Sequence, residues 1–228
     1  MTIEIKDNRN NVLLSEEFLP NRELEKTNSE SAQFICTQCG ECCHIREKKN
    51  MTLDEESAYT SYMYTRFGII YLANLSEITI NVWPEEKTIL EKEALKSGIN
   101  LNIKPKRAVH NSKTNELIIL DYFIDHDICP FFDKKTKLCG VYELRPLICK
   151  SYPLLTTQNL GKCRYKKLDV NAYGSEKEAA IKLDQRIAKQ KQILLQMIQN
   201  KEIVIHDMTD LELHKILSTA VFKELRIN

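Results

Sequence analysis

A block of four cysteines constrains this sequence more than any other feature. Four thiols fall within eight residues, in the spacing Cys-x-x-Cys-x-x-Cys-Cys, at Cys36, Cys39, Cys42 and Cys43. Four more follow later in the chain, at Cys129, Cys139, Cys149 and Cys163. Thiolates are soft ligands that select zinc and iron over magnesium or calcium, and such spacing is typical of metal sites. We therefore predict that all eight cysteines are metal ligands.

Chain length, the N-terminal sequence and cysteine usage predict the cellular compartment of the protein. A chain of 228 residues can bury a hydrophobic core without covalent staples, so the cysteines are not needed for bulk stability. The sequence from Met1 to Asp7 lacks the features of a secretory signal, and no apolar run is long enough to span a membrane. We expect a cytoplasmic protein, where a reducing environment favours ligands or catalytic thiols over disulfides.

The charge balance bears on the class of partner. The chain has 33 basic and 32 acidic residues, for a formal net charge of +1. Sequence-independent attraction to nucleic acid or to anionic lipid requires a marked excess of basic residues. We therefore predict no nucleic-acid partner and no membrane association, and we allow for a protein partner or a protein substrate.

The residue pattern predicts an α+β fold: a mostly helical single domain with a small antiparallel β element, built around a cysteine-rich metal-binding core. Strand-like segments at residues 2–6 and 11–14 indicate an N-terminal hairpin. Apolar alternation around residues 99–103 and the strand formers of residues 117–124 predict a further antiparallel pair. We divide the chain into an N-terminal arm (1–33), a cysteine-cluster domain (34–168) and a C-terminal helical extension packed on the core (169–228).

Four helices are expected from their start and stop signals. A capping box of Thr52 and Glu55 opens a helix over residues 53–67, which we expect to cover the cysteine loop. Proline suits the first turn of the next helix, over residues 84–97. Ser175 opens a third helix to about residue 200 with the same capping pattern, and a last helix is expected over residues 209–225.

Two features of the first cysteine block favour different metals. The segment from Cys36 to Gly40 is similar to the knuckle of zinc ribbons, where a left-handed glycine lets backbone N–H groups point at sulfur. Together with Cys129-Pro130, the same block matches a ferredoxin-type run, whose remote fourth ligand precedes proline. We prefer an iron-sulfur cluster to zinc on this ground.

The adjacent pair Cys42-Cys43 bears on how many metal centres the cysteines form. Neighbouring side chains point to opposite sides of an extended chain, so one of the two most easily serves a second metal. The eight cysteines then form either two four-thiolate centres or one polynuclear centre with a spare or bridging thiol. The spacing leaves both arrangements open.

Other polar residues near the cysteines receive lesser roles. We expect His44 to be a solvated residue or one that supports a ligand rather than a ligand itself. Arg145 is expected to donate N–H groups to backbone carbonyls or to thiolates. Asp125, His126 and Asp127 are interpreted as a turn at the end of a strand.

The cysteine blocks resemble a known family. Residues 34–43, 128–132 and 138–153 are similar, in order and spacing, to the YkgJ-like cysteine-cluster (CxxCxxCC) family, a zinc- or iron-chelating domain. The resemblance implies a metal or iron-sulfur centre built from these cysteines and leaves the reaction open. Flagellin lysine N-methylase carries a similar cluster in a longer chain. The resemblance therefore implies one alternative function, that of a protein lysine N-methylase-like enzyme. A zinc-stabilised protein-interaction module is the other.

Overall fold

The computed structural model describes residues 4–6, 12–15, 36, 39–46, 51–77, 79–154, 173–206 and 208–227. The chain divides into two compact units, residues 1–31 and residues 32–228. In the first unit, β1 (Glu4–Lys6) and β2 (Val12–Ser15) pair antiparallel, which confirms the predicted hairpin.

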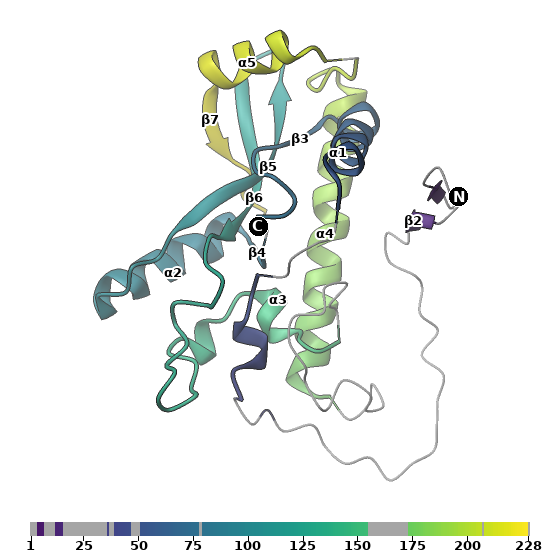
Figure 1. The fold of residues 1–228 in the computed structure, drawn as a ribbon. Helices are drawn as coiled ribbons and strands as arrows, with labels where there is room; N and C mark the ends of the chain where they lie inside the picture. Colours follow the sequence, from purple (N-terminus) through teal and green to yellow (C-terminus); the bar gives the residue numbers. More distant parts are fainter. Residues whose placement is uncertain are drawn as a thin grey trace. The chain divides into compact units, whose positions relative to one another are not determined.

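A five-stranded sheet forms the centre of the second unit (Figure 1). Its strands are β3 (Ile69–Tyr71), β4 (Asn81–Val82), β5 (Ile103–Asn111), β6 (Glu116–Ile124) and β7 (Val221–Glu224). The order is β3-β5-β6-β4, and β7 also pairs with β6. The long hairpin of β5 and β6 is the antiparallel pair that the sequence predicted, with Ile103 opposite Ile124 at one end and Asn111 opposite Glu116 at the other.

The predicted β element was too small because β3, β4 and β7 were missed, and it was wholly antiparallel because β7 is the parallel strand. Helix α5 (Asp210–Thr219) ends well before residue 225, and Ala220 turns into an extended conformation. Strand β7 then runs parallel to the first half of β6. Val221 and Phe222 are a β-branched and an aromatic residue, which favour a strand, and the edge of β6 offers the backbone partners that a longer helix would not use.

The remaining helices begin close to their predicted residues. Helix α1 (Leu53–Phe67) has the complete capping box of Thr52 and Glu55, and α2 (Pro84–Ser97) begins at its proline. Helix α4 (Ser175–Gln199) has the expected length. Its predicted capping box is wrong, because Ser175 lies inside the helix and Gly174 occupies the N-cap position without a side-chain bond.

Alternate residues of the sheet face two separate hydrophobic clusters. On one face, Val109 and Leu120 pack with Met63 of α1 and Leu194 of α4. Figure 1 shows these two helices side by side on that face. On the other face, Ala108, Leu117 and Ile119 belong to a cluster that includes α2 and extends to the cysteines. Helix α1 therefore covers the sheet, and the expectation that it covers the cysteine loop is wrong.

A charged pair is buried between the two central strands. Arg107 of β5 lies opposite Asp121 of β6, and Arg107 Nε lies 3.0 Å from Asp121 Oδ2. The Asp121 side chain is fully buried. The ionised Asp121 carboxylate is therefore stable there only when it is paired with the Arg107 guanidinium, because an unpaired charge in an apolar core is strongly unfavourable.

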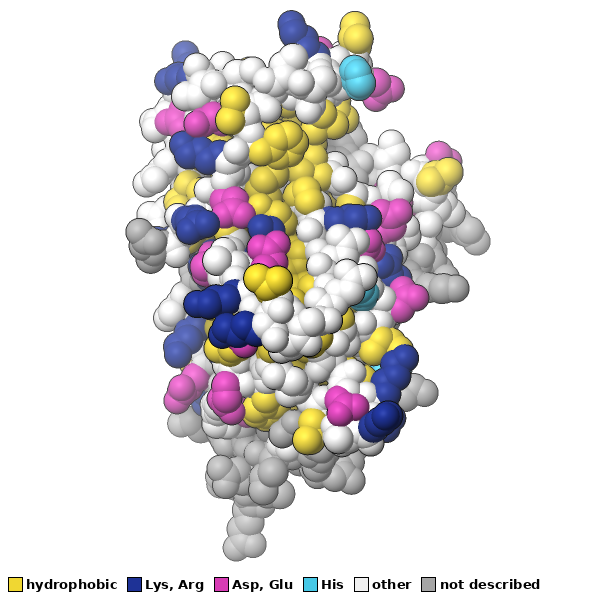
Figure 2. All heavy atoms as spheres, turned by 90° about the vertical axis from the view of Figure 1, so that its left-hand side faces the viewer, with side chains coloured by type: hydrophobic (Ala, Val, Ile, Leu, Met, Phe, Trp, Pro, Cys, Tyr) yellow, Lys and Arg dark blue, Asp and Glu magenta, His cyan; other side chains and the backbone are white. Residues whose placement is uncertain are grey.

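The surface carries charges of both signs. Figure 2 shows Lys, Arg, Asp and Glu side chains interspersed over one face, around a strip of apolar side chains. Among the described side chains, that face has no continuous basic patch. No described helix is long and apolar enough to cross a membrane.

We expect Asp121→Asn to lower the free energy of unfolding by about 3 kcal/mol, because it leaves the buried Arg107 charge without its counterion. Urea denaturation measures the change. Glu116→Gln is the matched control, since Glu116 lies on the same strand and pairs with Lys223 at the surface. Its stability should stay close to that of the parent chain. Equal losses in the two variants would contradict this interpretation.

Candidate metal centre

The first cysteine block ends in a tight turn. Gly40 has φ +81° and precedes the short 3-10 turn η1 (Glu41–Cys43). The Cys43 N–H donates to the Gly40 carbonyl oxygen over 2.9 Å. A Cβ atom at Gly40 would also collide with the ring of Phe132. The predicted left-handed glycine is thus confirmed, and its absent side chain makes room for the second cysteine segment.

Backbone hydrogen bonds join this turn to the segment that carries Cys129. The Cys129 N–H donates to the Cys43 carbonyl oxygen over 2.7 Å, and the Ile45 N–H donates to the Asp127 carbonyl oxygen over 3.0 Å. Between them, His44 and Ile128 form an antiparallel bridge. Two cysteines that are far apart in the sequence are therefore held next to each other by main-chain contacts.

Arg46 reinforces the same junction. Its Nη2 atom lies 2.7 Å from Asp125 Oδ1, and its Nε atom lies 2.6 Å from Asp127 Oδ1. The neighbouring His126 accepts a hydrogen bond from the Asn102 N–H over 3.1 Å. These residues stabilise the end of β6 and its connection to Cys129, in agreement with the predicted turn.

The third cysteine segment folds back on the second. The Gly140 N–H donates to the Phe131 carbonyl oxygen over 2.8 Å, and Phe132 forms an antiparallel bridge with Cys139. At the tip of this loop Lys137 has φ +62°. Its amino group lies 5.7 Å from the centre of the Phe132 ring. The loop thus places both Cys139 and a cation next to the segment that carries Cys129 and Phe132.

Cys149 comes from the single-turn helix α3 (Leu147–Lys150). The first N–H of this helix, on Leu147, donates to Glu86 Oε1 over 2.8 Å. The other oxygen of Glu86 accepts the Trp83 N–H at the start of α2 over 2.9 Å. Burial raises the pKa of Glu86 to about 7, although both N–H donors favour its charged form.

These segments together enclose one cavity of about 40 Å³. Six of the seven described cysteines line it: Cys36, Cys42, Cys43, Cys129, Cys139 and Cys149. Apolar side chains complete much of the wall, among them Ile80, Leu90 and Phe131. Among the described residues of the lining, Lys137 and Arg145 are the two cationic side chains. This volume is a few times the volume that one water molecule needs, so the cavity has room for a few atoms.

Of the two remaining cysteines, Cys39 is among the described residues. Cys39 is exposed and does not line the cavity. Cys163 lies outside the described residues. All seven described cysteines are free thiols.

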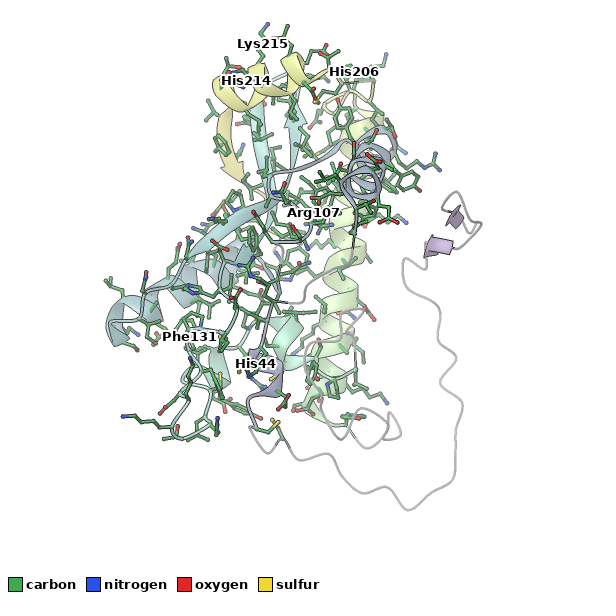
Figure 3. All side chains as sticks on the ribbon, in the orientation of Figure 1. His44, Arg107, Phe131, His206, His214 and Lys215 are labelled. Atoms are coloured by element: carbon green, nitrogen blue, oxygen red, sulfur yellow. The ribbon has the colours of Figure 1, made fainter. Side chains whose placement is uncertain are left out.

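The histidines likewise lie away from the cavity lining. His44 is exposed, with its ring centre 6.4 Å from that of Phe132. His44 and Phe131 lie near the cysteine turn, whereas His206 and His214 lie at the opposite end of the second unit (Figure 3). Imidazole is therefore absent from the described lining of the cavity.

The expectation that Cys42 and Cys43 point to opposite sides is wrong. Both line the same cavity, and the Cys43 thiol is hydrogen-bonded to the Cys42 sulfur. The physical reason is that the two residues lie in a 3-10 turn rather than in an extended chain. Successive side chains of such a turn are rotated by about 120°, so neighbours need not face opposite ways.

Burial and mutual repulsion shape the acidity of the thiols. Burial raises the pKa of Cys129 to about 12 and also raises the pKa values of Cys139 and Cys149. The hydrogen bond from Cys43 lowers the pKa of Cys42 to about 7, and the charge of Arg145 acts in the same direction. Several thiolates therefore cannot share this cavity without added positive charge, which is what a metal ion supplies.

Arg145 makes the kind of contact that the sequence predicted. Its Nε atom donates to the Tyr142 carbonyl oxygen over 2.9 Å, and its guanidinium lies 3.8 Å from the centre of the Tyr142 ring. The predicted bond to a backbone carbonyl is therefore present. Because the same guanidinium lines the cavity, its charge also favours the ionised form of nearby thiols.

The chemistry of the lining fits a soft metal. Among the described residues of the lining, the soft metal ligands are thiols, and carboxylates, which magnesium and calcium require, are absent. In the described part of the chain, no three Cys, His, Asp or Glu side chains form a group that could hold a metal ion as they stand. The thiols thus surround a common space without converging on one point within it.

An α+β protein whose core encloses a thiol-lined cavity is, as a class, suited to chelating metal. The family model CxxCxxCC, described as "Putative zinc- or iron-chelating domain", matches residues 35–176. The chain belongs to this family. Comparisons with curated proteins and with solved structures give no match.

Sequence reasoning missed Glu86. It lies on α2, 61 positions before the Leu147 N–H that it binds. Its local signal was that of an ordinary acidic residue in the first turn of a helix. No spacing rule connects it to Cys149, so the contact emerges only when the chain is folded.

We expect Gly40→Ala to lower both stability and bound metal. The left-handed backbone costs a non-glycine residue about 1 to 2 kcal/mol, and the added methyl group would also displace Phe132. Gly98→Ala is the matched control, because Gly98 has φ +63° and open space around it. The control should lose stability to a similar backbone penalty and keep its metal. Thermal unfolding and metal analysis measure the two effects, and equal metal content in both variants would contradict the role of Gly40.

The raised pKa of Glu86 predicts a pH effect. The folded chain holds this proton up to about pH 7, whereas the unfolded chain releases it near pH 4.5, so Glu86 makes the fold less stable as pH rises through this window. Glu86→Gln lacks this titration. We expect the stability of the variant relative to the parent to rise by about 3 kcal/mol between pH 4.5 and pH 8 in urea denaturation. A difference that is constant with pH would show that folding does not raise the pKa of Glu86.

Proposed function

We propose that this protein holds one cysteine-ligated metal centre in the thiol-lined cavity, with an iron-sulfur cluster preferred to zinc. The observation that carries the proposal is the gathering of six thiols, from segments far apart in the sequence, around one small space. Gathering so many thiols together has a chemical rationale when they bind a metal, and the family description points to the same class of function.

A single centre accounts for the geometry better than two separate ones. A closed zinc site uses four ligands in a tetrahedron, whereas six thiols line this cavity. The hydrogen-bonded pair Cys42 and Cys43 faces one space, which suits a polynuclear centre with a bridging or spare thiol. The Cys-x-x-Cys-x-x-Cys run and Cys129-Pro130 further favour iron-sulfur ligation.

The surroundings of the cavity suit a buried anionic centre. An iron-sulfur cluster held by four thiolates carries a net negative charge. Lys137 and Arg145 line the same cavity and can offset this charge. An iron-sulfur cluster bound there would supply one-electron transfer. The chain's own contribution is to hold the thiols, to exclude water through the apolar wall and to balance the charge.

Anaerobic purification tests the proposal, followed by an absorption spectrum and by metal and sulfide analysis of the same sample. The expected result is a coloured protein with iron and acid-labile sulfide. Zinc without sulfide would overturn the iron-sulfur assignment and favour a zinc-stabilised interaction module. A protein that binds neither metal, even after reconstitution, would overturn the metal centre itself.

Single cysteine variants test which thiols belong to the centre. We expect Cys149→Ser to lose most of the bound metal, because Cys149 lines the cavity. Cys39→Ser makes the same chemical change at an exposed thiol outside the lining, and it should retain more metal. Metal content per chain measures both. Equal losses would add Cys39 to the centre and contradict the set of six thiols.

A further inference from the structure

Helix α3 lacks a cap of its own. It is one turn long and starts after Pro146, whose side chain accepts no hydrogen bond. The first N–H groups of a helix have no partner within it and need an acceptor from elsewhere. The Leu147 N–H finds this acceptor in Glu86, on a different helix. The start of α3 is therefore tied to a side chain of α2, while the helix itself packs against α4.

Glu86 connects α3 to a wall of the cavity. Its second oxygen accepts the Trp83 N–H, so both carboxylate oxygens are used and the side chain is fixed at two points. One turn further along α2, Leu90 lines the cavity. Cys149, two residues beyond Leu147, lines the same cavity. A single carboxylate thus holds the helix that carries a thiol against the helix that forms the apolar wall.

A matched residue on α2 makes a different connection. Glu85 precedes Glu86 and forms an ion pair with Arg186 of α4. The Arg186 guanidinium also lies 4.5 Å from the centre of the Trp83 ring. Glu85 therefore joins α2 to α4, and among the described residues no hydrogen bond runs from Glu85 to α3. This separates a general packing contact from a contact that positions Cys149.

We propose that Glu86 is a positioning residue of the metal centre: by binding the first N–H of α3, its carboxylate fixes where Cys149 enters the cavity. The inference rests on the proposed metal centre. Loss of the carboxylate would free α3 to shift and would leave two backbone N–H groups without their acceptor. Residues that orient metal ligands in this way typically change metal affinity by 10- to 100-fold when replaced.

The test uses Co²⁺ added to the metal-free full-length protein, because the absorption of cobalt reports thiolate ligation. Affinity is measured by competition with a chelator for the parent, Glu86→Ala, Glu86→Gln and Glu85→Gln. We expect Glu86→Ala to bind Co²⁺ at least tenfold more weakly, with a changed thiolate absorption, and Glu86→Gln to be affected less because it keeps one acceptor oxygen. Glu85→Gln should match the parent.

A double variant separates positioning from general destabilisation. If Glu86 acts through Cys149, Glu86→Ala combined with Cys149→Ser should bind no more weakly than Cys149→Ser alone. Additive losses would overturn the inference, as would affinities within twofold of the parent for both Glu86 variants. If Glu86→Ala does not fold, Glu86→Gln provides the same comparison. Failure of the parent itself to bind Co²⁺, iron or zinc would instead overturn the proposed metal centre.

Discussion

The hydrogen bond from the Cys129 N–H to the Cys43 carbonyl oxygen is the contact on which the site depends. It joins the turn of the first cysteine block to the segment after β6, and the bridge of His44 with Ile128 continues the pairing. Because β6 pairs with β5, β4 and β7, this junction ties the cysteine turn to the middle of the sheet. The remaining cysteine segments pack against these two joined segments.

Electrostatics explains why such a cavity needs a cation. Burial raises the pKa values of Cys129, Cys139 and Cys149, so these thiols hold their protons when nothing compensates their charge. Lys137 and Arg145 supply some positive charge at the lining. A metal supplies more, and it displaces the protons as it binds. The apolar wall strengthens both effects, because charges interact more strongly where water is excluded.

Much of the fold could be predicted because its signals are local. The capping boxes at Thr52 and Thr209 are complete in the structure, and α2 begins at Pro84, since these residues act on the backbone within one helical turn. The β5–β6 hairpin followed from composition and alternation. Strand β7 was missed because its pairing with the edge of β6 is a long-range contact that overrides the helical pattern of residues 209–225.

The sequence by itself determined the chemistry of the candidate site: a set of thiol donors, a left-handed glycine at Gly40 and membership of a chelating family, all carried by residue type and short spacing. The tertiary structure alone decided which thiols share a space. It turned Cys42 and Cys43 toward one cavity, left Cys39 outside its lining and brought Glu86 to the helix of Cys149. Those outcomes depend on how distant segments pack, and local spacing contains no information about that packing.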